Sequence, residues 1–158
     1  MQIQPYDILL YKGTSIIGKL IELVTHSQYS HCGLSVCDFH IAEALSKGIE
    51  ITHSRDIPTG YDIYRYINPL TDEQKQKLHE FIYLKIATKY NFEELFSALL
   101  QEEYGIKFPV VKGKLICSQF VFLAYKYINV NLLPDLRKGE IVTPGDLSTS
   151  KLLVKISD

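Results

Sequence analysis

Hydrophobic and polar residues alternate through much of the first 67 positions of the chain, and this pattern predicts β-strands. The two clearest stretches are Tyr29–Cys37 and His40–Leu45, which together predict a hairpin that turns at Asp38-Phe39. Shorter strands are expected at Tyr6–Tyr11, Ile49–Thr52, Tyr61–Ile67 and, near the end of the chain, Leu152–Ile156. Because most of these strands follow one another closely, we expect a compact antiparallel sheet.

Apolar residues recur at intervals of three and four in other parts of the chain, which predicts helices. These helices are expected at Ile16–Val24, Thr71–Thr88, Phe92–Glu103 and Ile116–Ile128. Thr71 and Gln74 have the spacing of a capping box at the start of one of them. The segment Thr143-Pro144-Gly145-Asp146 predicts a turn. An early sheet followed by helices indicates an α+β fold.

The composition is that of one ordinary globular domain. A length of 158 residues predicts a single domain over residues 1–158. Seventeen Lys and Arg against eighteen Asp and Glu give a net charge of −1, which argues against a nucleic-acid partner. No apolar run approaches the roughly 20 residues that span a bilayer, and the first residues do not read as a secretory signal. We therefore expect a cytoplasmic protein without stable membrane insertion; its oligomeric state is left open.

Cys117 is the first candidate for chemistry, because it lies at or near the start of the predicted helix Ile116–Ile128. The N–H groups and the partial positive charge of a helix N-terminus stabilise a thiolate and lower the pKa of a cysteine. The same N–H groups can bind the oxyanion of a tetrahedral intermediate. The alternative role for Cys117 is that of a small buried hydrophobic residue.

His31 is the second candidate, and it lies in the predicted strand Tyr29–Cys37. Strand alternation places one set of residues, His31, Gly33, Ser35 and Cys37, on one face, and the apolar set Cys32, Leu34 and Val36 on the face toward the core. Gly33 has no side chain, so we expect it to leave space beside His31 for a ligand. A purely structural role is the alternative for a single histidine in a strand.

Glu43 is the third candidate, because it is an acidic residue in the otherwise apolar segment Ile41-Ala42-Glu43-Ala44. From the second strand of the hairpin its carboxylate can reach the ring of His31 and fix the imidazole tautomer. The alternative is a carboxylate that faces solvent on an edge strand.

Short motifs follow one another in a recognisable order along the chain. They are Asp7-Ile8-Leu9, Tyr29-Ser30-His31-Cys32-Gly33, Ile41-Ala42-Glu43-Ala44, Cys117-Ser118 and Thr143-Pro144-Gly145-Asp146-Leu147. In this order, with the histidine strand before the cysteine helix, the chain resembles the circularly permuted branch of the NlpC/P60 papain-like superfamily, the YiiX- and YaeF-like amidases. The resemblance spans residues 6–150 and implies a papain-like fold with cysteine-peptidase-like chemistry.

This resemblance implies a role for each candidate residue. Cys117 would be the nucleophile, His31 the general base, and Glu43 the group that orients the imidazole. Tyr90 matches a tyrosine found near the nucleophile, although core packing is an equal alternative for it. The substrate-binding residues would be Tyr90, Gly33 and Ser118. The implied reaction is hydrolysis of an amide bond in a small peptide, amide or acyl substrate through a thioester, with no metal or other cofactor.

A structural zinc site is the main alternative to a hydrolase. The possible ligands lie within fifteen residues of one another; they are His26, His31, Cys32, Cys37 and His40. Zinc ligands must converge on a tetrahedron, whereas strand alternation sends Cys32 and Cys37 to opposite faces. A turn in place of the strand would favour zinc.

Two further alternatives keep the same fold. One is an acyltransferase or esterase that acts on lipids or acyl esters and resembles the lecithin:retinol acyltransferase group. The C-terminal residues Leu152–Asp158 are too short and polar to be the apolar anchor common in that group. The other is a binding module without catalysis, which would need none of Cys117, His31 and Glu43. Fold alone does not decide between an enzyme and a binding module.

Overall fold

The structure is a computed structural model that describes residues 2–13, 27–45, 48–87, 116–136 and 142–156. Within these ranges, six strands form one antiparallel sheet with the order β4-β3-β2-β1-β5-β6. The strands are β1 (Ile8–Lys12), β2 (Tyr29–Cys37), β3 (His40–Leu45), β4 (Gly48–His53), β5 (Tyr61–Tyr66) and β6 (Leu153–Ile156). The helices in the same ranges are α2 (Asp72–Ala87), α4 (Ile116–Tyr127) and α5 (Pro144–Ser148). The chain is therefore α+β, as its pattern predicts.

The predicted strands are confirmed. β2 and β3 have the predicted bounds and form a hairpin that turns at Asp38-Phe39. The other strands begin and end within two residues of the expected positions. In β1, β3 and β5, successive residues belong alternately to two different apolar clusters. In β2, Cys32 and Leu34 enter the main core, and small or polar residues occupy the positions between and beside them.

The helix predictions are confirmed in part. α2 begins after a capping box in which the Gln74 N–H donates to Thr71 Oγ1 at 3.2 Å and the Thr71 N–H donates to Gln74 Oε1 at 3.0 Å. The turn expected at Thr143-Pro144-Gly145-Asp146 is instead the start of the short helix α5, because Thr143 and Asp146 form a second capping box and Pro144 suits the first helical turn. The predicted helices Ile16–Val24 and Phe92–Glu103 lie outside the described residues.

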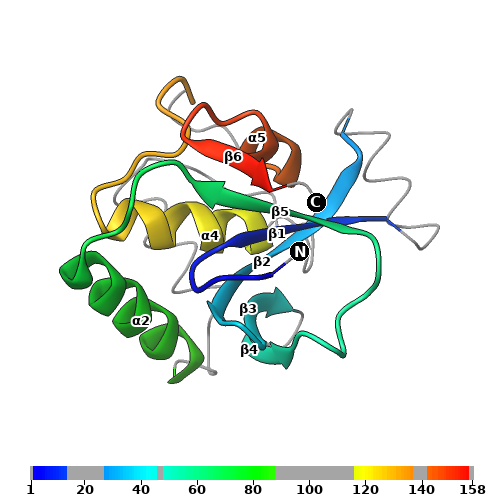
Figure 1. Ribbon diagram of the computed structural model, residues 1–158, viewed down its shortest axis with the longest axis horizontal. Helices are drawn as coiled ribbons and strands as arrows, with labels where there is room; N and C mark the ends of the chain where they lie inside the picture. Colours follow the sequence, from blue (N-terminus) through cyan, green and yellow to red (C-terminus); the bar gives the residue numbers. More distant parts are fainter. Residues whose placement is uncertain (1, 14–26, 46–47, 88–115, 137–141, 157–158) are drawn as a thin grey trace.

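The main core lies between the sheet and α4. On the sheet side it is formed by inward-facing residues of all six strands, among them Ile8, Leu10, Cys32, Leu34, Ala42, Ala44, Ile49, Tyr64 and Leu153. α4 contributes Phe120, Val121 and Ala124, and Figure 1 shows α4 behind the strands. Helix α2 packs on α4 through Phe81 and Phe120, whose ring centroids are 5.9 Å apart. The N-terminus of α4 is thereby fixed against the sheet.

A partly buried ion pair fastens the start of β1 to β5. The guanidinium of Arg65 donates from Nε and Nη2 to the two carboxylate oxygens of Asp7, at 2.7 and 2.8 Å. Asp7 is only 1% exposed, so its charge depends on this bidentate partner and on the Gln4 N–H, which donates at 2.8 Å. This pair holds β1 in place between β2 and β5.

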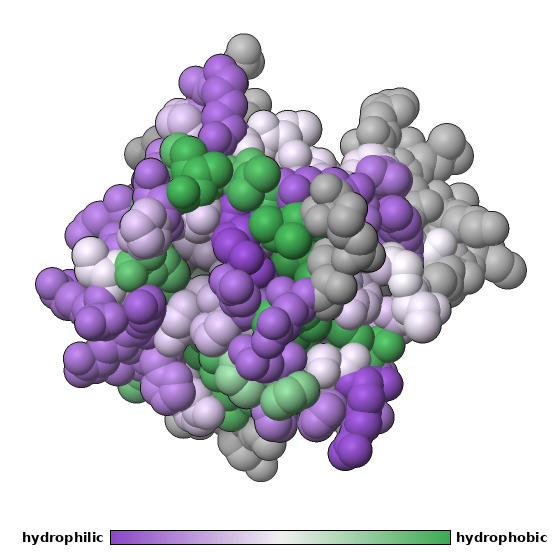
Figure 2. All heavy atoms as spheres, viewed as in Figure 1, coloured by the Kyte–Doolittle hydropathy of each residue, from purple (hydrophilic) through white to green (hydrophobic). Residues whose placement is uncertain are grey.

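The outer surface is mostly polar. Figure 2 shows hydrophilic side chains over most of the visible face, with hydrophobic ones in small groups between them. In the part of the chain that the structure describes, no helix has the length and apolar character that crossing a bilayer requires.

Candidate active site

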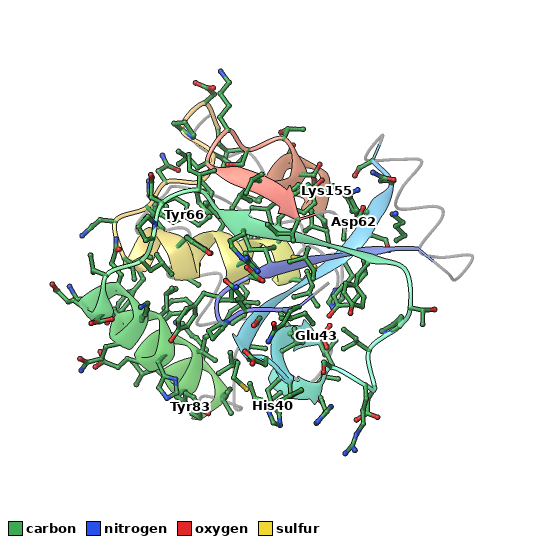
Figure 3. The ribbon with its side chains drawn as sticks, in the orientation of Figure 1. His40, Glu43, Asp62, Tyr66, Tyr83 and Lys155 are labelled. Atoms are coloured by element: carbon green, nitrogen blue, oxygen red, sulfur yellow. The ribbon has the colours of Figure 1, made fainter. Side chains whose placement is uncertain are left out.

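His31 and Glu43 are brought together by the register of the β2–β3 hairpin. Glu43 pairs with Gly33, so its side chain lies on the same face as that of His31, two residues away along β2. Glu43 Oε1 is 3.1 Å from His31 Nε2. Glu43 is 5% exposed and is therefore not the solvent-facing residue of the alternative interpretation. Figure 3 shows it inside the molecule between neighbouring strands.

The close approach of Glu43 to β2 depends on Gly33. A Cβ atom at position 33 would lie 2.6 Å from Ile41 Cγ2 and 3.0 Å from Glu43 Cγ. The space beside Gly33 is thus filled by these two side chains and is not open to a ligand, which differs from the role in substrate binding expected for it. The missing side chain serves the carboxylate instead, because it lets Glu43 come close to His31.

Tyr11 completes the surroundings of the imidazole, and the sequence analysis did not find it. Tyr11 on β1 pairs with His31 on β2, and the two rings stack with centroids 5.3 Å apart and planes 27° apart. The Tyr11 hydroxyl is buried next to Glu43, and burial followed by that carboxylate raises the pKa of Tyr11. The alternation of residues in β1 shows on which face of the sheet Tyr11 lies. It does not show that Tyr11 lies opposite His31, because the pattern of a single strand does not fix its register with a neighbour.

Cys117 reaches the histidine because β2 continues past its pairing with β3. The pairing of these strands covers Gly33 to Cys37, while β1 follows β2 back to Tyr29. The N-terminus of α4 lies against this stretch of β2. There Cys117 contacts the His31 ring, the Cys32 thiol and the Cys32 backbone N–H. Cys117 has no exposed surface, whereas the His31 side chain is 23% exposed.

The charges of the three residues support one another. A hydrogen bond from the Cys32 thiol, together with His31, lowers the pKa of Cys117 against the opposing effect of burial. Burial lowers the pKa of His31, but Cys117 and Glu43 outweigh it and raise that pKa to about 10. Burial raises the pKa of Glu43, yet the bond to His31 leaves it below its usual value. At neutral pH these directions favour a thiolate, an imidazolium and a carboxylate side by side.

Two other candidate residues are placed differently. Ser118 is fully buried, and its hydroxyl donates to the Val142 carbonyl at 2.7 Å, which fastens α4 to the segment before α5. This bond gives Ser118 a structural task, and nothing in its position shows contact with a substrate. Tyr90 lies outside the described residues.

The side chains considered as possible zinc ligands do not lie on one face of the sheet. Cys32 faces α4, whereas Cys37 Sγ lies 3.3 Å from His40 Nδ1 at the end of the hairpin. In Figure 3, His40 lies away from Glu43, toward that end. His26 is outside the described residues, and among the residues described no three His, Cys, Asp or Glu side chains are arranged to hold a metal ion. Strand alternation is the physical reason for this division.

Comparison with known proteins shows a similarity in fold. No family model matches the chain, and no curated protein matches it. Among solved structures, it is similar to the crystal structure of the metalloprotein yiiX from Escherichia coli O157:H7, DUF1105, with 21% sequence identity and a TM-score of 0.57. The match covers 99% of this chain and 98% of the other. At this level of identity the likeness concerns the fold, and the chain therefore has a YiiX-like α+β fold.

Proposed function

We propose that this protein is a cysteine-dependent hydrolase of the permuted papain-like, NlpC/P60 type, which cleaves an amide bond in a small peptide or amide substrate. The observation that carries the proposal is the cluster of Cys117, His31 and Glu43. These residues come from three separate elements, and a nucleophile, a base and an orienting carboxylate meet in it. A fold alone needs no such combination.

The reaction would proceed in two stages. In the first, the Cys117 thiolate forms a bond to the substrate carbonyl carbon, and the carbonyl oxygen becomes an oxyanion beside the N-terminus of α4. When the carbon–nitrogen bond breaks, the His31 imidazolium gives its proton to the departing amine, which leaves an acyl thioester on Cys117. In the second stage, neutral His31 takes a proton from water as the water attacks the thioester. The carboxylic acid and the Cys117 thiolate are then released.

Glu43 determines which ring nitrogen of His31 does this work. Because Nε2 is bonded to Glu43, the contact with Cys117 falls to Nδ1. Stacking on Tyr11 holds the ring plane in the same orientation. The imidazole is thus preorganised before any substrate binds.

A metal does not enter this mechanism. The structural neighbour is described as a metalloprotein. In the described residues of this chain, however, the side chains able to bind a metal do not converge as a set of three. We therefore derive no step from a metal, and metal analysis of the purified protein belongs to the first tests.

The experiment that tests the proposal is turnover of a panel of acyl amides and acyl esters. We expect Cys117→Ala and His31→Ala to abolish hydrolysis while circular dichroism shows an intact fold, and we expect amides to be cleaved. Cys37→Ala is the matched control, because this thiol lies at the far end of β2. Full activity in the Cys117→Ala protein, or stoichiometric zinc whose removal unfolds the chain, would contradict the proposal. Cleavage of esters alone would favour the esterase or acyltransferase alternative.

A further inference from the structure

A second thiol lies against the proposed nucleophile. Strand alternation turns Cys32 toward α4, while its neighbour His31 projects on the other side of β2. Cys32 and Cys117 are both fully buried in the same core, and the Cys32 thiol is hydrogen-bonded to Cys117. The hydrogen bond from Cys32 helps to keep Cys117 ionised, but the hydrolytic reaction moves its protons through His31 and forms no covalent bond to Cys32. The two thiols in contact can therefore react with each other in a way that hydrolysis does not use.

Two thiols in contact on facing elements have the arrangement from which a disulfide forms. The bond requires an S–S distance of about 2.05 Å and Cβ atoms that face each other. Cys32 on β2 and Cys117 on α4 are both fully buried in the core between strand and helix, and a hydrogen bond joins their thiols. Cys37 cannot take this place, because it lies at the hairpin end with its Sγ 3.3 Å from His40 Nδ1.

We propose that Cys32 is a resolving cysteine, which joins Cys117 in a reversible disulfide after a hydroperoxide has oxidised Cys117. In the first step the Cys117 sulfur attacks the terminal oxygen of the hydroperoxide, the O–O bond breaks, and an alcohol or water leaves with a proton from His31. Cys117 is now a sulfenic acid. In the second step the Cys32 sulfur attacks the Cys117 sulfur, the S–O bond breaks, and the hydroxyl leaves as water with the Cys32 proton.

Reduction restores the site. A dithiol attacks the disulfide, returns both cysteines to thiols and is itself oxidised to a cyclic disulfide. Within this pair, Cys117 is the cysteine at which a peroxide reacts, since its pKa is lowered, that of Cys32 is raised, and thiolates are the reactive form. Without a resolving thiol, the sulfenic acid would continue to the sulfinic acid, which dithiols do not reduce. Cys32 thus protects the nucleophile from permanent loss.

The disulfide removes the nucleophile and therefore switches the proposed hydrolase off. Only this consequence rests on the proposed function, because disulfide formation can be measured without a substrate. The two ideas can consequently fail separately. A disulfide in a protein that hydrolyses nothing would refute the hydrolase and leave the redox pair, whereas an active enzyme without the disulfide would refute the pair.

The experiment treats the reduced full-length protein with hydrogen peroxide, blocks the remaining thiols with N-ethylmaleimide, and maps the cysteines by mass spectrometry. We expect a peptide pair joined through Cys32 and Cys117, with Cys37 carrying the blocking group. Hydrolysis should fall in step with this pair and return after dithiothreitol. Cys117 found as sulfinic acid without the linked peptides, or joined to Cys37, would overturn the proposal.

Two matched variants sharpen the result. Cys37→Ser should behave as the unchanged protein does. Cys32→Ser keeps a hydrogen-bond donor but has no sulfur, so peroxide should convert its Cys117 to the sulfinic acid, and dithiothreitol should restore little of its own starting activity. Recovery as complete as in the unchanged protein would overturn the proposal. If Cys32→Ser does not fold, the peptide map of the unchanged protein decides alone.

Discussion

The imidazole of His31 is held by three different residues. Its plane stacks on Tyr11, its Nε2 atom is bonded to Glu43, and its ring contacts Cys117. Each contact fixes a different property of the proposed base: the ring plane, the tautomer and the direction in which a proton would be transferred. The side chain has therefore lost most of its freedom before any substrate arrives, which is the kind of preorganisation that accelerates a reaction.

The first prediction at this scale concerns pH. Activity should rise with the ionisation of Cys117, at a pH well below the ordinary range of a thiol, because its pKa is lowered. It should fall as His31 loses its proton, near pH 10, because the pKa of His31 is raised to about 10. The dependence of kcat/KM on pH measures both limbs. An acid limb at the ordinary pKa of cysteine would show that the ion pair does not form.

Replacement of Glu43 by glutamine tests the alkaline limb of that profile. Without the carboxylate the imidazolium is less stable, so the alkaline limb of Glu43→Gln should move to lower pH. We expect kcat/KM to fall by roughly 100-fold or more, since an amide in the place of a triad carboxylate can cost about 10⁴-fold. An unchanged alkaline limb would show that Glu43 does not stabilise the His31 imidazolium during the reaction.

Gly33 gives a third prediction at the residue scale. The Cβ atom of Gly33→Ala would meet Ile41 and Glu43 at distances that require these side chains to move. We expect a loss of about 1–3 kcal/mol in the free energy of unfolding, as for other overpacked sites, together with a lower kcat/KM. Urea unfolding and kinetics measure the two effects. Unaltered values for both would mean that Glu43 has room that the structure does not show.

The sequence named His31, Glu43 and Cys117 from their places on a strand, a hairpin and a helix start. It could not name Tyr11 or the contact of Cys32 with Cys117. Those contacts depend on the register between β1 and β2 and on the position of α4 against β2, which are long-range properties of the fold. The pattern within one segment shows which face a side chain takes, but not what it meets there.

At the scale of elements, the strands follow their pattern most closely. β2 and β3 are predicted to the residue because alternate positions, Cys32 and Leu34 in β2 and Ala42 and Ala44 in β3, lie in the main core. Small or polar residues such as Gly33 and Glu43 occupy the positions between them. α5 was mistaken for a turn because a helix of five residues is too short to show periodicity. The residues of its capping box, Thr143 and Asp146, can be read from the sequence. The sequence does not show how long a helix they cap.

The capping box of α2 gives a prediction for an element remote from the candidate site. Thr71→Ala removes the oxygen that accepts the Gln74 N–H at 3.2 Å. We expect a loss of about 1 kcal/mol in the free energy of unfolding, and an unchanged kcat/KM. Chemical denaturation gives the first value. Thr71→Ser is the control that keeps the hydroxyl, and equal losses in both variants would show that the cap contributes nothing.

At the scale of the whole molecule, α4 connects the candidate site to the other end of the fold. Its first turn carries Cys117, and Ser118 binds the Val142 carbonyl. Near its last turn, the Tyr125 hydroxyl donates to the Tyr6 carbonyl, just before β1, at 2.8 Å. The helix is therefore fastened at both ends, which keeps its N-terminus against β2.

The remote end of α4 gives a prediction that separates stability from activity. Tyr125→Phe keeps the ring but removes the bond to Tyr6, so we expect a loss of about 1–2 kcal/mol in the free energy of unfolding. Because Cys117 lies at the opposite end of the helix, kcat/KM of the folded protein should not change. Thermal unfolding and kinetics below the transition test this. A large fall in kcat/KM would show that this anchor controls the position of the nucleophile.

The complete coverage of Cys117 has a kinetic consequence. A reagent can meet this sulfur only during a brief local opening, so its measured rate is the intrinsic rate of a thiolate multiplied by the fraction of time spent open. The rate of iodoacetamide labelling of Cys117 in the native chain, divided by the rate for an exposed thiol of the same ionisation, gives that fraction. Each tenfold decrease in this ratio corresponds to about 1.4 kcal/mol in the free energy of opening. A substrate that lowers the free energy of this opening would then be distinguished from other substrates by a faster reaction rather than by tighter binding.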